Sequence, residues 1–442
     1  METIAAIATA HGIGSIAIVR VSGPDALMLA CSLAQKPSFS PRHATLSSLF
    51  DPQGALIDEA LVVYFQAPKS FTGEEVVEFQ CHGGMMVASM VLDTLLGYGA
   101  RLAAPGEFSK RAFLNGRIDL AEAEAIAKLI EAKSEEAAKI LARQMKGELS
   151  RFVNEARESL LEILAYVEVS IDYAEEDLPE GLIHQMEAKL TALEQQLGQV
   201  VTVSEQRKGL MQGFKVAIVG KPNVGKSSLL NGLLHYDRAI ISDVAGTTRD
   251  TIEEEMRIGT HLIKIVDTAG IRHTEEKVEQ IGIARSKKAI EEADIVLALF
   301  DASRPKDAED VEILALLDAY ASSKHVVYLL NKTDLPKVFE GLENALHVST
   351  LSSLSCVADA LRTHLDTQRM DEGMLLTSTH QIASVRKAHE AIIEAKPRLE
   401  EAELELFAFH LNEAIGALGA ITRPYGVDEM LDKMFGTFCL GK

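Results

Sequence analysis

The 442-residue sequence contains no tryptophan, and aromatic residues make up only 5% of it. Ala, Leu and Glu are plentiful instead, and these residue types favour helices. Hydrophobic residues still reach 47%, so the chain can bury large cores. Its length suits two to four domains.

Cysteine is scarce as well. The four cysteines, Cys31, Cys81, Cys356 and Cys439, are far apart and form no CxxC pair. This argues against a structural zinc site and against a disulfide framework. The pattern is typical of a cytosolic protein with reduced thiols.

Positive charge is also in short supply. The chain has 44 Lys and Arg residues and 65 Asp and Glu residues, which gives a formal net charge of -21. Such a chain will not coat nucleic acid nonspecifically, because phosphate binding needs clustered cations. Any RNA contact requires a local basic patch or a partner protein.

Membrane and export signals are missing from the sequence. The first ten residues are apolar but lack the basic region of a signal peptide. We expect no apolar run long enough to span a bilayer. The sequence therefore predicts a soluble, cytoplasmic protein without membrane contact.

The first 117 residues mix short β-rich runs with Gly and Pro, which predicts an α+β domain. An apolar helix is expected at Met85–Leu96, after the Gly83-Gly84 turn. The expected strands are Ser15–Val21, Leu61–Phe65 and Val76–Phe79.

Residues 118–210 have a helical pattern. Asp119 and Glu122 predict a capping box at its start. One apolar stripe at three- and four-residue steps predicts a long helix over Leu141–Ile171. We expect Pro179 and Gly181 to break the pattern before a second helix toward Val200.

Residues 211–370 alternate strands and helices, which predicts a parallel sheet covered on both faces. The helical pattern returns over residues 371–442. The simplest topology is a Ras-like α/β P-loop domain inserted into a helical domain. The expected strands are Val216–Val219, Leu262–Val266, Ile295–Phe300 and Val326–Leu330.

A phosphate-binding loop follows the first of these strands. The segment from Gly220 to Ser227 fits GxxxxGK[ST], with a strand before it and an apolar helix, Ser228–Leu234, after it. Lys226 is expected to reach the β- and γ-phosphates and assist catalysis, and the loop amides to surround the phosphates. Contacts are predicted for Asn223, Val224, Gly225, Lys226, Ser227 and Ser228.

Two later segments carry the expected magnesium and γ-phosphate contacts. The Ser227 and Thr248 hydroxyls are predicted Mg²⁺ ligands, with Asp267 in the outer shell. The Gly270 N–H suits the γ-phosphate. The predicted nucleotide contacts here are Ser242, Asp243, Val244, Ala245, Gly246, Thr247, Thr248, Asp267, Thr268, Ala269 and Gly270.

The base-reading motif consists of Asn331, Lys332 and Asp334. The Asp334 carboxylate can accept two hydrogen bonds from guanine N1 and N2, which adenine does not offer. This predicts a GTPase and argues against the alternative of an ATPase motor. A weaker fifth motif is expected at Ser349, Thr350 and Leu351.

The position after Gly270, where many GTPases carry a water-orienting Gln, is Ile271. Asn223 either helps to bind a monovalent cation beside the phosphates or is an ordinary loop residue. Such a cation would stabilise transition-state charge as an arginine finger does. Three glutamates remain candidates for orienting water: Glu275, Glu276 and Glu279.

The whole chain resembles the MnmE (TrmE) family of tRNA-modification GTPases. The specific segments lie outside the GTPase motifs: Phe71–Glu74, Glu78 with His82–Gly84, Pro105–Leu120, and the terminal Phe438–Lys442.

This resemblance implies an N-terminal domain that dimerises and binds 5-formyl- or 5,10-methylene-tetrahydrofolate. The implied folate contacts are Arg20, Glu78, Arg117 and Lys442. Arginine and lysine suit the glutamate-tail carboxylates, and a glutamate suits the pterin N–H groups. Cys439 either lies near the one-carbon unit or is a small buried residue that positions Lys442; the lack of activating basic neighbours favours the second.

The resemblance also implies potassium stimulation through dimerisation of the GTPase domains, with Glu279 as the catalytic acid. The implied K⁺ ligands are Asn223, Ser242, Val244 and Thr247. The implied function is tRNA wobble-uridine C5 modification with an FAD-dependent partner of the MnmG (GidA) type, which would supply most of the tRNA contact. The alternative is a ribosome- or RNA-associated GTPase switch without folate chemistry.

Overall fold

The computed structural model divides into two compact units. Unit 1 comprises Met1–Ile130, Ala142–Glu194 and Lys387–Lys442, and unit 2 comprises Glu131–Leu141 and Gln195–Arg386. The residues described are 2–10, 12–172, 180–236, 254–266, 287–352, 354–367, 373–400, 403–423, 435–436, 438 and 441.

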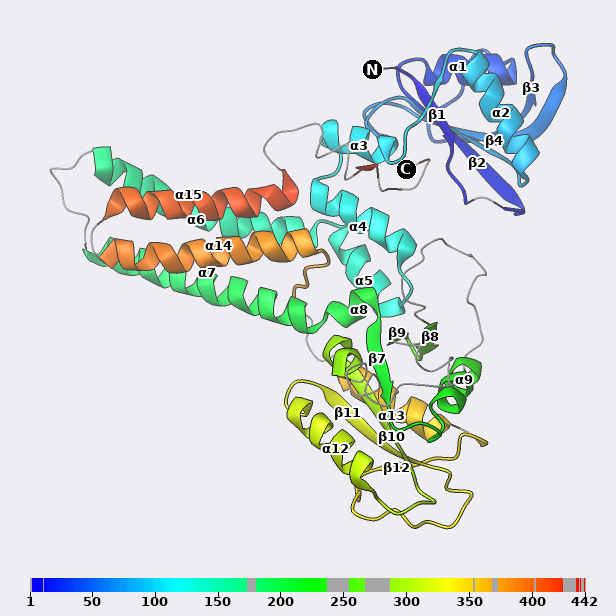
Figure 1. The fold of residues 1–442 in the computed structure, drawn as a ribbon. Helices are drawn as coiled ribbons and strands as arrows, with labels where there is room; N and C mark the ends of the chain where they lie inside the picture. The colour runs from blue at the N-terminus through cyan, green and yellow to red at the C-terminus, as the bar shows by residue number, and fades with distance from the viewer. Residues whose placement is uncertain are drawn as a thin grey trace. The chain divides into compact units, whose positions relative to one another are not determined.

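Unit 1 begins with a six-stranded sheet in the order β3-β4-β5-β2-β1-β6 (Figure 1). Helices α1 and α2 pack on it through Leu33 and Leu95, which are fully buried with Val19 and Phe79 in one core cluster. The expected strands and helix of the α+β domain are confirmed. The elements are β1 (Ile4–Ile7), β2 (Ile16–Ser22), α1 (Ala26–Ala34), β3 (Ala44–Phe50), β4 (Leu56–Phe65), β5 (Val76–His82), α2 (Met85–Gly97) and β6 (Arg101–Leu102).

The helices that follow are shorter than the sequence predicted. Asp119 and Glu122 form the expected capping box, each backbone N–H donating to the other side chain at 2.9 Å. The prediction of a single helix over Leu141–Ile171 was wrong, because a turn at residues 145–147 divides the apolar stripe between α5 and α6. The elements are α3 (Glu107–Leu114), α4 (Leu120–Glu131), α5 (Glu135–Gln144) and α6 (Glu148–Asp172).

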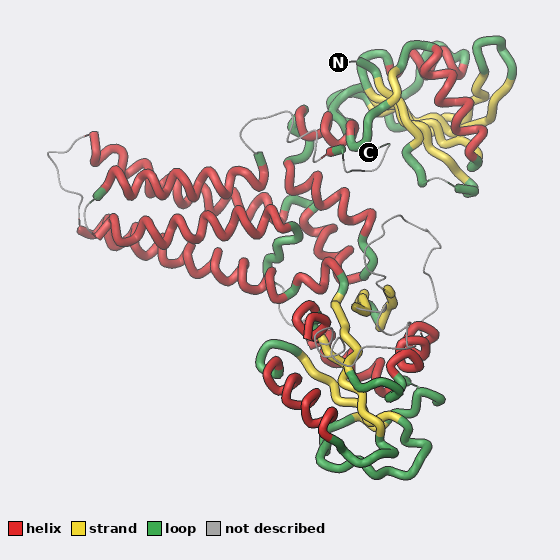
Figure 2. Tube along the Cα trace, in the orientation of Figure 1, coloured by secondary structure: helices red, strands yellow, loops and turns green. Residues whose placement is uncertain are grey.

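Three further helices contribute to the helical part of unit 1, and two of them, α7 (Glu180–Gln206) and α14 (Thr379–Glu400), also extend into unit 2. The expected break is confirmed, because α6 ends at Asp172 and the second helix, α7, begins at Glu180. Gly181, however, lies in the first turn of α7 and not before it. Lys189 on α7 donates to Glu162 on α6 at 2.6 Å, and Lys396 on α14 donates to Glu194 on α7 at 2.7 Å. Figure 2 shows α6 and α15 (Leu404–Thr422) running side by side.

The α15 helix corrects one expectation. It is 19 residues long with a window of mean hydropathy 1.2, so by length and composition alone it could cross a membrane. However, 44% of that window is buried, and Phe407, Leu411 and Leu418 have no exposed surface. A core helix of a soluble protein has the same composition.

Unit 2 contains the second six-stranded sheet, in the order β12-β11-β10-β7-β9-β8. All neighbouring pairs are parallel except β8–β9, which is antiparallel. The four predicted strands are confirmed, but the antiparallel edge was not expected. The elements are α8 (Lys208–Gln212), β7 (Phe214–Val219), α9 (Lys226–Tyr236), β8 (Glu254–Ile258), β9 (His261–Val266), β10 (Ile295–Asp301), α12 (Ala308–Tyr320), β11 (His325–Asn331), β12 (Leu346–His347) and α13 (Ser355–Thr367).

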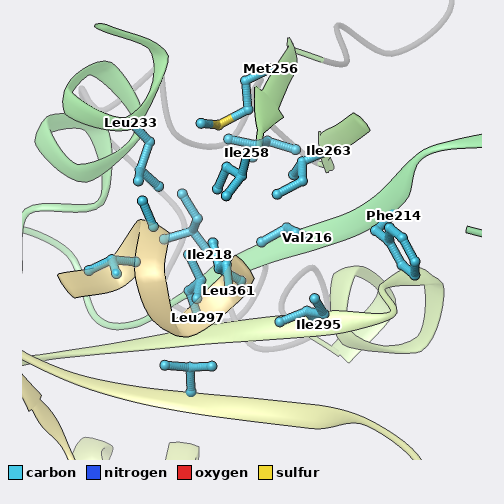
Figure 3. Close-up of a cluster of buried hydrophobic side chains, with 14 of the residues drawn as sticks. Phe214, Val216, Ile218, Leu233, Met256, Ile258, Ile263, Ile295, Leu297 and Leu361 are labelled. Atoms are coloured by element: carbon cyan, nitrogen blue, oxygen red, sulfur yellow. The ribbon is translucent and has the colours of Figure 1, made fainter. Parts of the chain in front are cut away.

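Apolar cores lie on both faces of this sheet, as expected for strands buried on both sides. One face packs Val216, Ile218 and Leu297 against Leu233 of α9 and Leu361 of α13 (Figure 3). The opposite face forms a separate cluster that includes Leu317 of α12. In the sequence, the nucleotide motifs follow directly at the ends of β7, β9 and β11.

Candidate functional site: the nucleotide-binding loops

The phosphate loop joins β7 to α9. Two of its glycines are required by close approach. A Cβ at Gly220 would lie 2.4 Å from the Leu299 carbonyl oxygen, and one at Gly225, where φ is +105°, would lie 2.3 Å from Asn331 Nδ2. The loop therefore packs directly against the neighbouring strands β10 and β11.

Lys226 begins α9 and turns back over the loop. Its Nζ donates to the carbonyl oxygens of Gly220 and Lys221, both at 2.7 Å. Burial lowers the pKa of this ammonium from its ordinary value. The loop thus holds a partly desolvated cation beside its own backbone, where a phosphate oxygen is expected.

Asn331 joins three motifs and is only 1% exposed. Its Nδ2 donates to the Val224 carbonyl at 2.8 Å, and its Oδ1 accepts from the Thr350 backbone N–H at 3.1 Å. The structure gives Asn331 a positioning role: it connects the phosphate loop to the fifth motif. The sequence analysis had placed it only among the nucleotide contacts.

The fifth motif lies against the base-reading loop. The Ser349 hydroxyl donates to Asp334 Oδ1 at 2.7 Å, and the Leu351 N–H donates to Ser349 Oγ at 3.4 Å. The Leu351 side chain itself is 86% exposed. The weak sequence match at 349–351 therefore brings one residue, Ser349, into direct contact with the predicted guanine reader.

Two carboxylate contacts were missed by the sequence analysis. Lys332 Nζ donates to Asp301 Oδ2 at 2.6 Å. Burial acts to raise the pKa of Asp301, but hydrogen bonds from Lys332 and Ser303 outweigh it and hold the pKa below its ordinary value. The sequence signal that could have revealed the Lys332–Asp301 contact is an Asp at the end of a wholly apolar strand.

The second missed contact anchors the phosphate loop. Lys221 Nζ donates to Asp307 at 2.6 Å and to Asp310 at 2.8 Å. These two aspartates also form the capping box of α12. The loop is therefore tied to the start of α12 by an ion pair that no sequence motif indicates.

The remaining predicted nucleotide and metal contacts are either exposed or outside the described residues. Ser227 and Ser228 lie in the first turn of α9 and are exposed, as is Asn223, whose φ is +62°. The other predicted residues of the nucleotide, magnesium, potassium and catalytic sets lie outside the described residues: Ser242, Asp243, Val244, Ala245, Gly246, Thr247, Thr248, Asp267, Thr268, Ala269, Gly270 and Glu279.

A second candidate site lies in the N-terminal sheet. Arg20 on β2 and Glu78 on β5 are register partners, and Arg20 Nε donates to Glu78 Oε1 at 2.8 Å. The Arg20 guanidinium lies 5.7 Å from the ring centroids of both Phe71 and Phe108. The Arg20 and Glu78 side chains are 21% and 17% exposed, so the ion pair is partly desolvated.

The end of the chain reaches this pair. Arg20 Nη1 donates to the Gly441 carbonyl at 3.4 Å, although the two residues are 421 positions apart. A Cβ at Gly441 would lie 2.4 Å from the Ile7 carbonyl oxygen. Arg117, in contrast, donates to the Ser70 carbonyl at 3.1 Å. Cys439 and Lys442 lie outside the described residues.

Family models match both parts of the chain. The model described as the MnmE helical domain matches residues 120–439, and the model described as the GTP-binding protein TrmE N-terminus matches residues 3–117. The chain belongs to the MnmE family. The resemblance stated from sequence, the multidomain fold class and the assignment as a GTPase are thereby confirmed, while the domain bounds stay predictions.

Full-length MnmE relatives are similar over the whole chain. The tRNA modification GTPase MnmE of Sulfurimonas denitrificans is 58% identical over 443 residues, covering 100% of this chain and 99% of the relative. That of Sulfurovum sp. is 56% identical over 445 residues with the same coverage, and that of Campylobacter concisus is 53% identical with complete coverage of both.

Solved structures are similar over part of the MnmE chain. Era in complex with MgGDPNP and a segment of 16S ribosomal RNA is 26% identical, covers 40% of this chain and 66% of Era, and has a TM-score of 0.27. The FeoB G-domain from Methanococcus jannaschii is 22% identical, covers 36% of this chain and 98% of that domain, and has a TM-score of 0.23. Scores of this size support no conclusion about the whole chain.

Proposed function

We propose that this GTPase works with an FAD-containing partner to modify C5 of the wobble uridine of tRNA, using a tetrahydrofolate one-carbon donor. The observation that carries the proposal is the meeting of Arg20, Glu78 and the terminal Gly441 in one place. A GTPase switch alone has no use for such a site. The relatives' printed name, tRNA modification GTPase, supports the tRNA substrate.

The residues at this place fit a folate. The Glu78 carboxylate is an acceptor for pterin N–H groups, and the Arg20 guanidinium, which donates to it at 2.8 Å, orients that carboxylate. The partly buried ring of Phe71 next to the guanidinium provides an apolar wall for a planar ring, and it packs against the core cluster that contains the fully buried Phe108. The folate would supply the one-carbon unit, and this chain's residues would bind and orient it.

The first test is binding of 5-formyl-tetrahydrofolate to the full chain. Arg20→Gln is expected to weaken binding at least about tenfold, because it removes a charge-assisted contact. The measurement is calorimetric titration. Arg42→Gln is the matched control, since Arg42 also lies over an aromatic ring, Phe65, and donates to the Lys69 carbonyl instead of to Glu78 or Gly441.

The folate titration also separates the proposal from its rival. No detectable binding by the unaltered chain would favour a ribosome- or RNA-associated switch and leave the GTPase assignment intact. Binding by the unaltered chain and by Arg42→Gln, with loss in Arg20→Gln, supports the folate site. Equal affinity in both variants would remove Arg20 from it.

In the nucleotide site, residues of this chain would bind the phosphates and orient Mg²⁺. Lys226 would exchange its two carbonyl contacts for phosphate oxygens, and Ser227 would orient Mg²⁺. Mg²⁺ and K⁺ would neutralise charge on the phosphates when bound. Asn331 would keep the phosphate loop and the guanine-reading loop in register through Val224 and Thr350.

Potassium activation is the second part of the proposal. Hydrolysis is expected to be about tenfold slower in Na⁺ than in K⁺, because the cation stabilises transition-state charge. Phosphate release across K⁺, Na⁺ and protein concentration measures this effect. The same series tests whether hydrolysis depends on dimerisation, since dimer-dependent activity rises with concentration.

Asn223 allows a sharper version of the potassium test. Its φ of +62° is itself a reason for Asn, which tolerates the left-handed region. Asn223→Gly keeps that backbone freedom and removes only the amide. Loss of potassium stimulation in Asn223→Gly supports the ligand role, whereas full stimulation would show that Asn223 is there for its backbone.

We also infer a homodimer formed by the N-terminal domain, a partner of the MnmG type, and a cytoplasmic location. The net charge of -21 supports a partner that supplies most of the tRNA-binding surface. Size measurement of the full chain, alone and with the partner and tRNA, tests these associations together.

A further inference from the structure

Three potential metal ligands meet between α14 and α15 in unit 1. Glu394 lies on α14, and His410 and Glu413 lie three residues apart on α15. One ligating atom from each residue lies within 4.8 Å of the other two. Metal sites in helical bundles are built from Glu and His side chains on facing helices, including Glu–His pairs three residues apart in which the Glu precedes the His.

His410 supplies a second, separate observation. Its Nδ1 is buried and has no hydrogen-bond partner among the described residues. A buried polar atom without a partner is costly, so native structures usually provide one. The side chain is 14% exposed, whereas Glu394 is 64% exposed and Glu413 is 35% exposed. The histidine is thus fixed and one carboxylate is accessible.

The distances suit a metal better than direct hydrogen bonds. His410 Nδ1 lies 3.4 Å from Glu394 Oε2 and 3.6 Å from Glu413 Oε2. Charge-assisted N–H···O⁻ bonds are shorter, about 2.7–2.9 Å. Ligands about 2.0–2.2 Å from a tetrahedral ion lie roughly 3.3–3.6 Å from one another.

We propose that Glu394, His410 and Glu413 bind one Zn²⁺ ion. One nitrogen and two carboxylate oxygens form a donor set that zinc accepts, and three protein ligands leave the fourth position for water or another ligand. The Lys387 ammonium lies 3.9 Å from Glu413 Oε1, the oxygen that does not face His410. The ion would cross-link α14 to α15.

The sequence-based argument against a zinc site concerned cysteine ligands and does not apply to this group of residues. The lack of a CxxC pair argued against a structural zinc site, but this donor set contains no thiolate. Its residues are 16 and 19 positions apart across two helices, as the numbers of Glu394, His410 and Glu413 show, so only the packing of α14 on α15 brings them together. The proposal is independent of the folate and nucleotide sites.

The test is Zn²⁺ binding to the full, nucleotide-free chain, kept reduced and stripped of metal with a chelator. Competition against a chromophoric chelator measures stoichiometry and affinity. Glu394→Gln and His410→Gln are each expected to remove one Zn²⁺ equivalent or to weaken it at least about tenfold, since even outer-shell substitutions cost 10–100-fold. Co²⁺ in its place should show visible bands typical of tetrahedral coordination.

His184→Gln is the matched control. His184 and Glu187 on α7 are also a His and a Glu three residues apart, with His184 Nδ1 3.3 Å from Glu187 Oε2. Among the described residues, no third potential ligand joins them. This variant should keep the Zn²⁺ equivalent. Glu394 is exposed, so Glu394→Gln should fold even where His410→Gln does not. Without metal, the thermal unfolding of Glu394→Gln should match that of the unaltered chain. Zn²⁺ should raise the Tm of the unaltered chain and of His184→Gln, but not of Glu394→Gln.

Two results would overturn the proposal. One is a folded Glu394→Gln variant that binds Zn²⁺ with unaltered stoichiometry and affinity. The other is loss of the same equivalent in His184→Gln, which would show that zinc binds to surface histidines in general.

Discussion

Asp334→Asn is expected to change the nucleotide preference from GTP to XTP. The carboxylate accepts from guanine N1 and N2, whereas a carboxamide accepts one hydrogen bond and donates the other, as xanthine requires. One acceptor is lost and the other loses its charge. At about 1.5–3 kcal/mol for a hydrogen bond to a charged group, the affinity for GTP should fall by about a hundredfold or more. Competition between labelled GTP and XTP measures the change.

Ser349→Ala is the control that the structure provides. The Ser349 hydroxyl donates to Asp334 Oδ1 at 2.7 Å, so its removal disturbs the position of the carboxylate without altering its chemistry. GTP binding should weaken modestly, with GTP still preferred over XTP and ATP. Asp334→Asn with unchanged GTP affinity would contradict the guanine assignment, and equal hydrolysis of ATP by the unaltered chain would favour an ATPase motor.

Glu279→Ala is expected to lower the GTP hydrolysis rate by about 10²–10⁴-fold, the usual contribution of a general acid or base. Ile271 occupies the position where many GTPases carry a water-orienting Gln, so another group must act on the water. GTP affinity should stay within about twofold, because the loss concerns only the transition state. Single-turnover hydrolysis in K⁺, with binding measured separately, distinguishes the two quantities.

Glu275→Ala and Glu276→Ala are the matched controls, since the sequence alone treated all three glutamates alike. Both should hydrolyse GTP at nearly the unaltered rate. A normal rate in Glu279→Ala would end its assignment, and a large loss in either neighbour would transfer the role to that residue.

Strand positions in the GTPase sheet could be predicted well because each strand is a continuous apolar run. Ile295–Phe300 became β10 with one added residue, Asp301. The antiparallel β8 was missed because its sequence, Glu254–Ile258, has polar residues and little apolar signal. The break at residues 145–147 was missed because the apolar spacing continues through the turn, which only the backbone reveals.

The nucleotide motifs could be read as a set, but not the contacts that hold them together. Lys226 and Asp334 belong to local patterns with a known chemical reason. Asn331 Nδ2 and the Val224 carbonyl are 107 positions apart, and Lys221 is 89 positions from Asp310. Contacts of this separation leave no periodic trace in one sequence.

The sequence by itself determined that the chain is a GTPase with flanking α+β and helical parts, because its motifs are short and contiguous. Only the tertiary structure decided which distant residues contact one another. It brought Gly441 to Arg20, Ser349 to Asp334 and Glu394 to His410. The physical reason is that burial and strand or helix packing, not sequence proximity, choose the partner of each polar group.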